Sequence, residues 1–133
     1  MSHDGSSVEL EKLIPRSLYE QMERNHKLNI SSEPEPGAID FRPVVKLMII
    51  AFGSTATWLL TEIDEQGIAF GLCDLGQGFP ELGYVDLQSL SKDFGDRLER
   101  DLHFRSTEKL SAYVNYARQK RMIITDLPSN YKQ

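Results

Sequence analysis

The sequence predicts an α+β fold: a single domain in which an antiparallel sheet of about four to five strands carries an N-terminal and a C-terminal helix. Four apolar stretches between residues 44 and 86 have the length and composition of strands. Their connections are too short for helical crossovers, so these strands should run antiparallel. Segments with apolar residues at helical spacing flank the strands and are expected to pack on the sheet.

The N-terminal part is predicted to hold one helix between two polar segments. Residues 1–8 are polar, and we expect residues 1–12 to be flexible. From Leu13 onward apolar residues recur at helical spacing, and Pro15 suits a first turn, which predicts a helix over residues 15–25. Residues 29–40 contain two prolines, a glycine and several charges, which predicts a long loop or a mobile arm.

The predicted strands comprise residues 44–52, 57–64, 68–75, 82–86 and 101–105. Residues 65–67 form a short hairpin connection between the second and third strands. Gly76 and Gly78 are interpreted as turn residues that let the chain leave the third strand sharply. Asp86 is expected to cap a brief helix that ends at Leu90.

The C-terminal part is predicted to begin with a helix capped by Ser106 or Thr107. The segment after this helix is compatible with one more short strand, and Pro128 is expected to end the ordered structure. These boundaries assign residues 13–127 to one domain and residues 128–133 to a tail.

Charge is distributed unevenly along the chain. The net charge is −5, but from residue 106 onward five basic side chains accompany only two acidic ones. Nucleic acid binding requires a concentrated positive surface, so the acidic body makes it unlikely unless Arg118, Lys120 and Arg121 supply the phosphate contacts. A solvated helix end, favoured by the helix dipole, is the commoner role for such residues.

Composition also limits the setting of the protein. The lone Cys73 excludes an internal disulfide and a Cys-rich zinc site. The sequence has no apolar run of about 20 residues and no secretory signal pattern. We therefore expect a cytoplasmic protein without membrane association.

Carboxylates near the predicted strand ends form one candidate site. Glu62 and Asp64 share a strand face, Glu81 follows the glycine-rich loop, and Asp101 begins the last predicted strand. Convergence of these four groups would create the metal site of a hydrolase or nuclease. Acidic groups at strand ends are more often solvated, and we expect no cofactor.

Two further side chains, His103 and Cys73, are of types that commonly act in catalysis. On a strand, His103 would share a face with Asp101, which would orient it for proton transfer. An exposed polar strand face is the simpler interpretation. Cys73 lies within a strand beside a carboxylate that disfavours its thiolate, so it is not expected to act as a nucleophile.

An exposed protein-binding surface is the other candidate site. Trp58, Phe79, Glu81 and Tyr84 would lie near one another if the second, third and fourth strands are neighbours. For Phe79 itself, we favour folding back over the sheet rather than presenting an apolar surface.

Seven segments between residues 13 and 117 read LIPRSL, RPVVKL, TWLLTEID, IAFGLCDLG, FPELGYVDL, ERDLHF and LSAY. Together they resemble a family of small bacterial proteins known only as a domain of unknown function. The resemblance implies an α+β domain and a setting on plasmids, integrative conjugative elements and other mobile DNA. It implies no catalytic residues.

The absence of a complete catalytic constellation favours a non-enzymatic accessory or interaction protein of a mobile element. A metal-dependent hydrolase or nuclease is the alternative, followed by DNA binding through the basic C-terminal helix. The sheet edges must be covered by a terminal segment or paired with a second copy, as in a homodimer.

Overall fold

A computed structural model describes residues 10–32, 38–51 and 54–131 of the chain. The sheet comprises β1 (Val45–Ala51), β2 (Ser54–Ile63), β3 (Ile68–Asp74), β4 (Glu81–Asp86) and β5 (Leu98–Arg100). The helices are α2 (Arg16–Ser32), α3 (Leu87–Phe94) and α4 (Leu110–Lys120), with single turns η1 (Gly95–Arg97) and η2 (Ser129–Tyr131).

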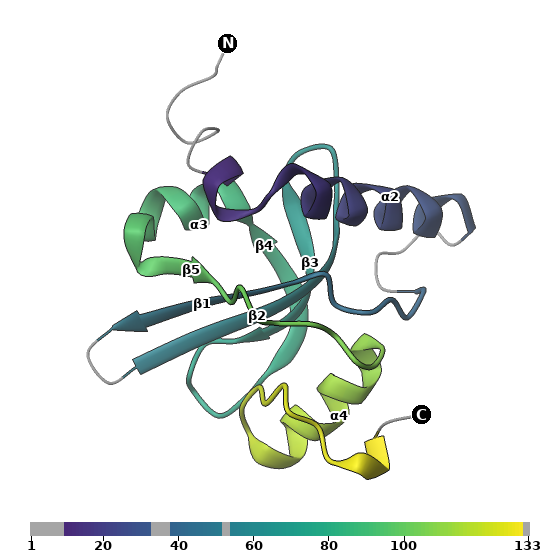
Figure 1. The fold of residues 1–133 in the computed structure, drawn as a ribbon, viewed down its shortest axis with the longest axis vertical. Coiled ribbons are helices and arrows are strands. Elements are labelled where there is room, and N and C mark those ends of the chain that lie inside the picture. The colour runs from purple at the N-terminus through teal and green to yellow at the C-terminus, as the bar shows by residue number, and fades with distance from the viewer. Residues whose placement is uncertain (1–9, 33–37, 52–53, 132–133) are drawn as a thin grey trace.

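All neighbouring strands are antiparallel, in the order β4-β3-β2-β1-β5 (Figure 1). This confirms the predicted α+β class. β1 to β4 follow one another as a meander, and the chain then returns across the sheet so that β5 pairs with β1. No helix within the described ranges is long and apolar enough to cross a membrane.

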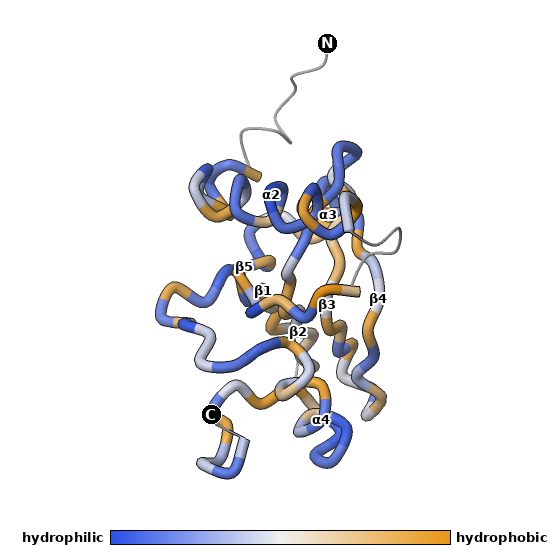
Figure 2. Tube along the Cα trace, turned by 90° about the vertical axis from the view of Figure 1, so that its right-hand side faces the viewer, coloured by the Kyte–Doolittle hydropathy of each residue, from blue (hydrophilic) through white to orange (hydrophobic). Residues whose placement is uncertain are grey.

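The sheet lies between α2 and α3 on one side and α4 on the other (Figure 2), and each side has its own apolar core. On one face, α2 and α3 pack over Leu47, Trp58 and Leu60. On the other, α4 and the segment after it pack over Leu59 and Leu72. Successive side chains of a strand point to opposite faces, so β2 is apolar at successive positions because it is central and buried on both sides.

β2 contains a bulge at Thr61, where its register with β3 shifts between Leu60 and Glu62. Gly71 lies opposite this bulge. A Cβ atom on Gly71 would lie 1.9 Å from the Leu59 carbonyl oxygen. Only glycine therefore allows β3 to approach β2 this closely.

α2 continues past its predicted end. Two asparagines in the extension of the helix are buried and hydrogen-bonded: Asn25 Nδ2 donates to a carbonyl of β2 (2.9 Å), and Asn29 Oδ1 accepts from the Ile39 N–H (2.8 Å). The loop predicted over residues 29–40 therefore begins as helix and is bonded back to it. Residues 33–37 lie outside the described ranges.

The N-terminal segment is more structured than predicted. Residues 10–13 are helical, and Leu10 and Leu13 pack against the core beneath α2 and α3. Residues 10–12, which belong to the segment predicted to be flexible, are therefore helical. Residues 1–9 lie outside the described part of the chain.

The last strand lies earlier in the chain than predicted. β5 precedes Asp101, and the predicted strand over residues 101–105 is a turn followed by irregular chain. The Asp101 Oδ1 atom accepts a hydrogen bond from the His103 N–H (2.9 Å), which fixes this turn.

One helix is capped by a residue next to it in the sequence, and another by a residue far away in the sequence. Asp86 caps α3 as predicted. Neither Ser106 nor Thr107 caps α4; instead Asp40 accepts hydrogen bonds from the N–H and the hydroxyl of Ser111 (3.0 and 2.6 Å). α4 is thus capped by a residue that precedes β1 in the chain.

The C-terminal segment packs without forming a strand. Residues 122–128 are irregular, so the additional strand is absent from the structure. Ordered structure continues past Pro128 into η2, where the ring of Tyr131 lies 5.2 Å from that of Tyr116. The predicted end of order at Pro128 is therefore wrong.

Candidate functional site

β4 forms one edge of the sheet. It pairs with β3 from Asp86 opposite Ile68 to Glu81 opposite Cys73, and none of the other described strands lies beside it. An edge strand presents unpaired backbone N–H and C=O groups that can bond to another strand. β4 also contains no lysine and no proline, the residues that commonly prevent such pairing.

Apolar side chains are exposed along this edge. Leu82 and Tyr84 alternate along β4 and are 44% and 60% exposed. Tyr84 packs on Phe70 (5.3 Å between ring centroids), which places both β4 side chains on the α4 face. In the β3–β4 loop, Leu75 and Phe79 are 57% and 72% exposed. We call Leu75, Phe79, Leu82 and Tyr84 the edge patch.

The loop that carries Leu75 and Phe79 is anchored at its base. The buried Asp74 carboxylate accepts hydrogen bonds from the N–H groups of Gly76 and Ile123, both at 2.9 Å. Gly76 and Gly78 have φ values of +79° and +85°, which confirms their predicted turn role. Asp74 therefore joins the loop to the segment after α4.

The structure divides the predicted interaction surface. Trp58 is buried in the core beneath α2 and α3, on the opposite face from Tyr84. Phe79 is 72% exposed and does not fold back over the sheet, which corrects the prediction, and Glu81 is exposed at the start of β4. Sequence reasoning missed Leu75 and Leu82, although the alternation of Leu82 with Tyr84 was an available signal.

The sheet also separates the four carboxylates considered as metal ligands. Glu81 and Asp101 lie at opposite edges of the sheet, about 19 Å apart at 4.8 Å per strand. Asp64 accepts two backbone N–H groups of its own turn. No three His, Cys, Asp or Glu side chains in the described ranges form a group that could hold a metal ion. The proposed set does not converge because its members lie in or next to β2, β4 and β5, and no two of these strands are neighbours.

Glu62, the fourth member of that set, is buried and faces α2. Its Oε1 atom lies 3.6 Å from His26 Nδ1. A hollow of about 380 Å³ lies beside this pair and is lined in part by His26 and Ile63. The pair connects α2 to β2 next to the bulge.

His103 and Cys73 are the two side chains that were considered for proton transfer and nucleophilic attack. His103 is exposed in the turn after β5, while the Asp101 carboxylate lies 3.4 Å from Lys46 Nζ. Burial raises the pKa of Cys73 to about 11, so it is a thiol at neutral pH.

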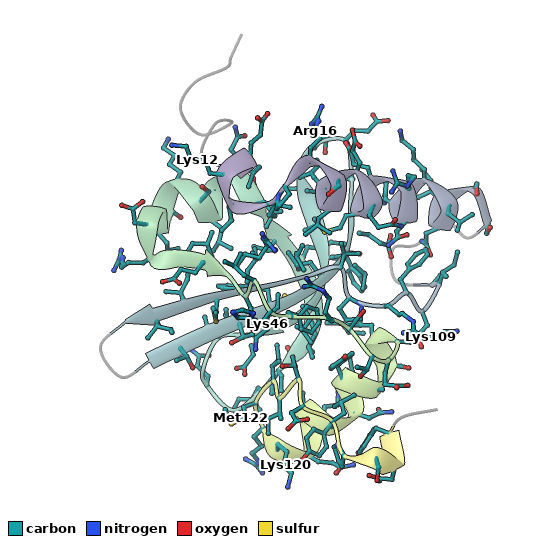
Figure 3. All side chains as sticks on the ribbon, viewed as in Figure 1. Lys12, Arg16, Lys46, Lys109, Lys120 and Met122 are labelled. Atoms are coloured by element: carbon teal, nitrogen blue, oxygen red, sulfur yellow. The ribbon has the colours of Figure 1, made fainter. Side chains whose placement is uncertain are left out.

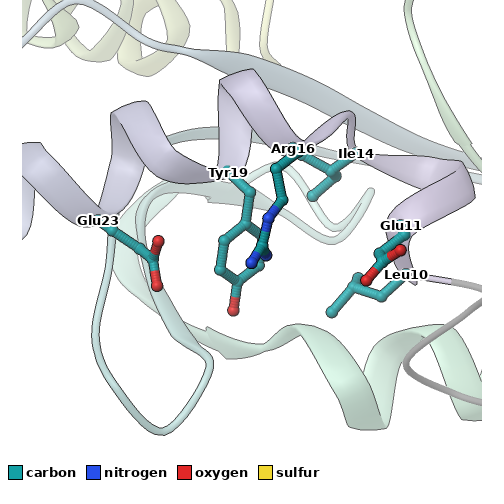
Figure 4. A pocket seen from close by; sticks show the side chains of 6 residues that line it. All are labelled: Leu10, Glu11, Ile14, Arg16, Tyr19 and Glu23. Carbon is teal, nitrogen blue, oxygen red and sulfur yellow. The ribbon is translucent and has the colours of Figure 1, made fainter.

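A hollow of about 280 Å³ lies beside the start of α2 (Figure 4). Arg16 and Tyr19, one helical turn apart, line it together with Glu23. Burial, assisted by the negative charge of Glu23, raises the pKa of Tyr19. The hollow therefore presents a neutral phenol at neutral pH rather than a base.

Arg118, Lys120 and Arg121 are all exposed at the C-terminal end of α4, where Figure 3 labels Lys120. Lys120 Nζ lies 5.6 Å from the ring centroid of Tyr116. Arg121 has a φ of 63° and ends the helix in the left-handed conformation. The three cations are close in sequence and share one end of the molecule.

Neither the curated proteins nor the solved structures contain a match to the chain. A family model described as Protein of unknown function (DUF2958) matches residues 13–124. This stretch includes the whole sheet together with α2, α3 and α4. The match also confirms the predicted resemblance to a domain family of unknown function. The chain belongs to the DUF2958 family.

Proposed function

We propose that the protein is a non-enzymatic interaction module that binds an extended segment of a partner protein along β4. The coincidence of an unpaired strand edge with the exposed edge patch carries this proposal. Backbone hydrogen bonds to the edge would supply affinity, and the alternating Leu82 and Tyr84 would select apolar residues at alternate positions of the bound segment.

The charges on β4 indicate what kind of segment it accepts. Glu81 and Asp86 are both exposed, at the two ends of the strand. Full-length antiparallel pairing of two copies would place Glu81 opposite Asp86 of the second copy, and like charges facing each other are destabilising. A foreign segment with apolar residues flanked by Lys or Arg fits better than a second copy.

The setting of this interaction follows from the sequence resemblance, which implies a bacterial mobile genetic element. We place the protein in the cytoplasm as an accessory factor, in agreement with its single half-buried cysteine. Its partner would then be a protein of the element or of its host.

A displayed library of random peptides of about ten residues, selected on the immobilised wild-type protein, tests the proposal. We expect enrichment of sequences that alternate apolar with basic residues. Leu82→Lys should lower the affinity for an enriched peptide by at least about tenfold, because a lysine on an edge strand opposes strand pairing. Ile50→Lys is the matched control, since Ile50 is also an exposed apolar residue on a strand.

Three outcomes would contradict the proposal. In the first, the selection enriches peptides with no common pattern. In the second, the enriched peptides bind the Leu82→Lys variant as tightly as the wild-type protein. The third is a homodimer, measured by light scattering, that Leu82→Lys converts to a monomer, since the edge would then bind a second copy.

DNA contact through α4 is a second candidate function, favoured by the three exposed cations at its end. Binding to duplex DNA would weaken steeply with salt, and Lys120→Ala would reduce the slope of log affinity against log salt by about one. Binding that is absent at low salt, or insensitive to salt, would remove this candidate.

A further inference from the structure

The edge of the sheet opposite β4 carries a further hollow, of about 550 Å³. β5 pairs with only three residues of β1, from Leu47 to Ile49, so it leaves the start of β1 without a strand neighbour on that side. The hollow lies where β5 stops, between the first turn of α2 and the segment over residues 101–106. We call it the β5 hollow; Figure 3 labels Lys46, which lines it.

Positive charge is in excess around the β5 hollow. Lys46 and Asp101 lie 3.4 Å apart and offset each other. Arg100 and Arg105, which also line the hollow, form no ion pair with any carboxylate in the described part of the chain. Among the described residues the two guanidinium groups therefore have no carboxylate partner, although the chain as a whole has a net charge of −5. This local excess favours an anion with two negative charges.

Hydrogen-bond donors at the β5 hollow are available for such an anion. Arg100 uses Nε to bond the Leu13 carbonyl (3.0 Å), so its two terminal amino groups remain for a ligand. The hydroxyls of Ser17 and Ser106 also line the hollow and make no hydrogen bond to the residues described. A guanidinium fork beside hydroxyl groups is an arrangement that binds phosphate oxygens.

The remaining lining of the β5 hollow is apolar. Leu18, Val44, Leu102 and Phe104 are among the apolar residues that line it. The volume lies within the range of about 300–1,000 Å³ typical of small-molecule sites, which combine an apolar lining with a few polar anchors. A bare inorganic ion would leave this apolar surface without contact.

We propose that the β5 hollow binds the phosphate group of a small phosphate monoester, whose organic part lies against Leu18 and Phe104. At neutral pH such a group carries a charge of about −1.5 to −2, which the two arginines match. This site is at the other edge of the sheet from the edge patch, so either proposal can fail without the other.

Titration of the ¹⁵N-labelled wild-type protein with phenyl phosphate at constant ionic strength tests the site without any substitution. We expect saturable shifts confined to the amides of residues 44–46 and 100–106 and to those of the first turn of α2. Inorganic phosphate should bind more weakly than phenyl phosphate because it lacks an apolar part. Benzoate should also bind more weakly than phenyl phosphate, because it carries only one negative charge. Shifts that do not saturate, shifts at the end of α4, or benzoate binding as tightly as phenyl phosphate would overturn the proposal.

Substitutions of the two arginines test whether they bind the phosphate group. Arg105→Glu should lower the affinity for phenyl phosphate at least about tenfold, since it replaces a cation with an anion at the hollow. Arg118→Glu makes the same charge change on α4 and should alter affinity by less than about twofold. Arg100→Lys keeps the charge but removes the fork, and should also weaken binding. Unchanged affinity in both Arg105→Glu and Arg100→Lys would overturn the proposal, and the Lys variant alone decides if Arg105→Glu does not fold.

Discussion

Gly71 and Gly83 lie opposite each other on β3 and β4, yet the space around them differs. A Cβ at position 71 would meet the Leu59 carbonyl oxygen at 1.9 Å, whereas at position 83 the nearest atom is Cys73 Sγ at 3.8 Å. Gly71→Ala should lower the free energy of unfolding by more than about 2 kcal/mol, because backbone must move. Gly83→Ala should change it by less than about 1 kcal/mol. Urea denaturation of both variants measures the difference; equal effects would show that the bulge tolerates a side chain.

Cys73 provides a second test at the scale of one side chain. Burial raises its pKa from 9.0 to about 11, so the thiolate is rarer in the folded protein than in the unfolded chain. At mildly alkaline pH, alkylation in the native state should therefore be about 100-fold slower than in denaturant. A native rate close to the denatured rate would mean that the thiol is accessible and its ionisation normal.

Among elements, the Lys46–Asp101 pair joins β1 to the segment after β5. Partial burial acts to raise the Asp101 pKa, but the bond from the His103 N–H and the charge of Lys46 outweigh it and hold the pKa below 3.8. A carboxyl group with a lowered folded pKa stabilises the protein above its unfolded pKa, and this contribution is lost as pH falls through the folded value.

Asp101→Asn should accordingly be less stable than wild type at neutral pH, and the difference should shrink as pH falls below 3.8. Denaturant unfolding of both proteins across the acid range measures it. Glu99→Gln is the control, because Glu99 is exposed on β5 next to this turn. A difference independent of pH would assign the effect of Asp101→Asn to the turn geometry rather than to charge.

The whole molecule depends on the segment after α4 to close its second core. Ile123 is buried in that core and its N–H donates to Asp74, whereas the adjacent Met122 is 50% exposed. Ile123→Ala should cost about 2–5 kcal/mol of unfolding free energy, and Met122→Ala less than about 0.5 kcal/mol. Thermal and urea unfolding test this, and similar losses in both variants would show that the segment packs loosely.

The sheet was predictable from sequence because its signals are local. Apolar runs, the connection over residues 65–67 and the turn glycines each act within a few residues. The contacts that complete the fold are not local. Asp40 caps α4 from 71 residues away, and Asp74 bonds a residue 49 positions later. Neither partner is marked by spacing, so the ends of the domain were assigned less well than its centre.

The candidate site was only partly predictable for a related reason. Tyr84 and Phe79 were identified because aromatic residues in a strand and a loop are conspicuous, but the face that each occupies depends on packing. Trp58 has the same local character as Tyr84, and only the position of β2 in the centre of the sheet buries it. The grouping of Arg100, Arg105 and Ser17 requires the return of the chain to the edge of β1, which no local pattern indicates.

That return also determines the order in which the sheet can assemble. β1 to β4 are joined by short connections, so their pairing closes small loops at low entropic cost. β5 must find β1 across roughly 50 residues, a contact of high sequence separation that forms slowly. We therefore expect the four-stranded meander to form first and β5 to dock last, with the β5 hollow absent until folding is nearly complete.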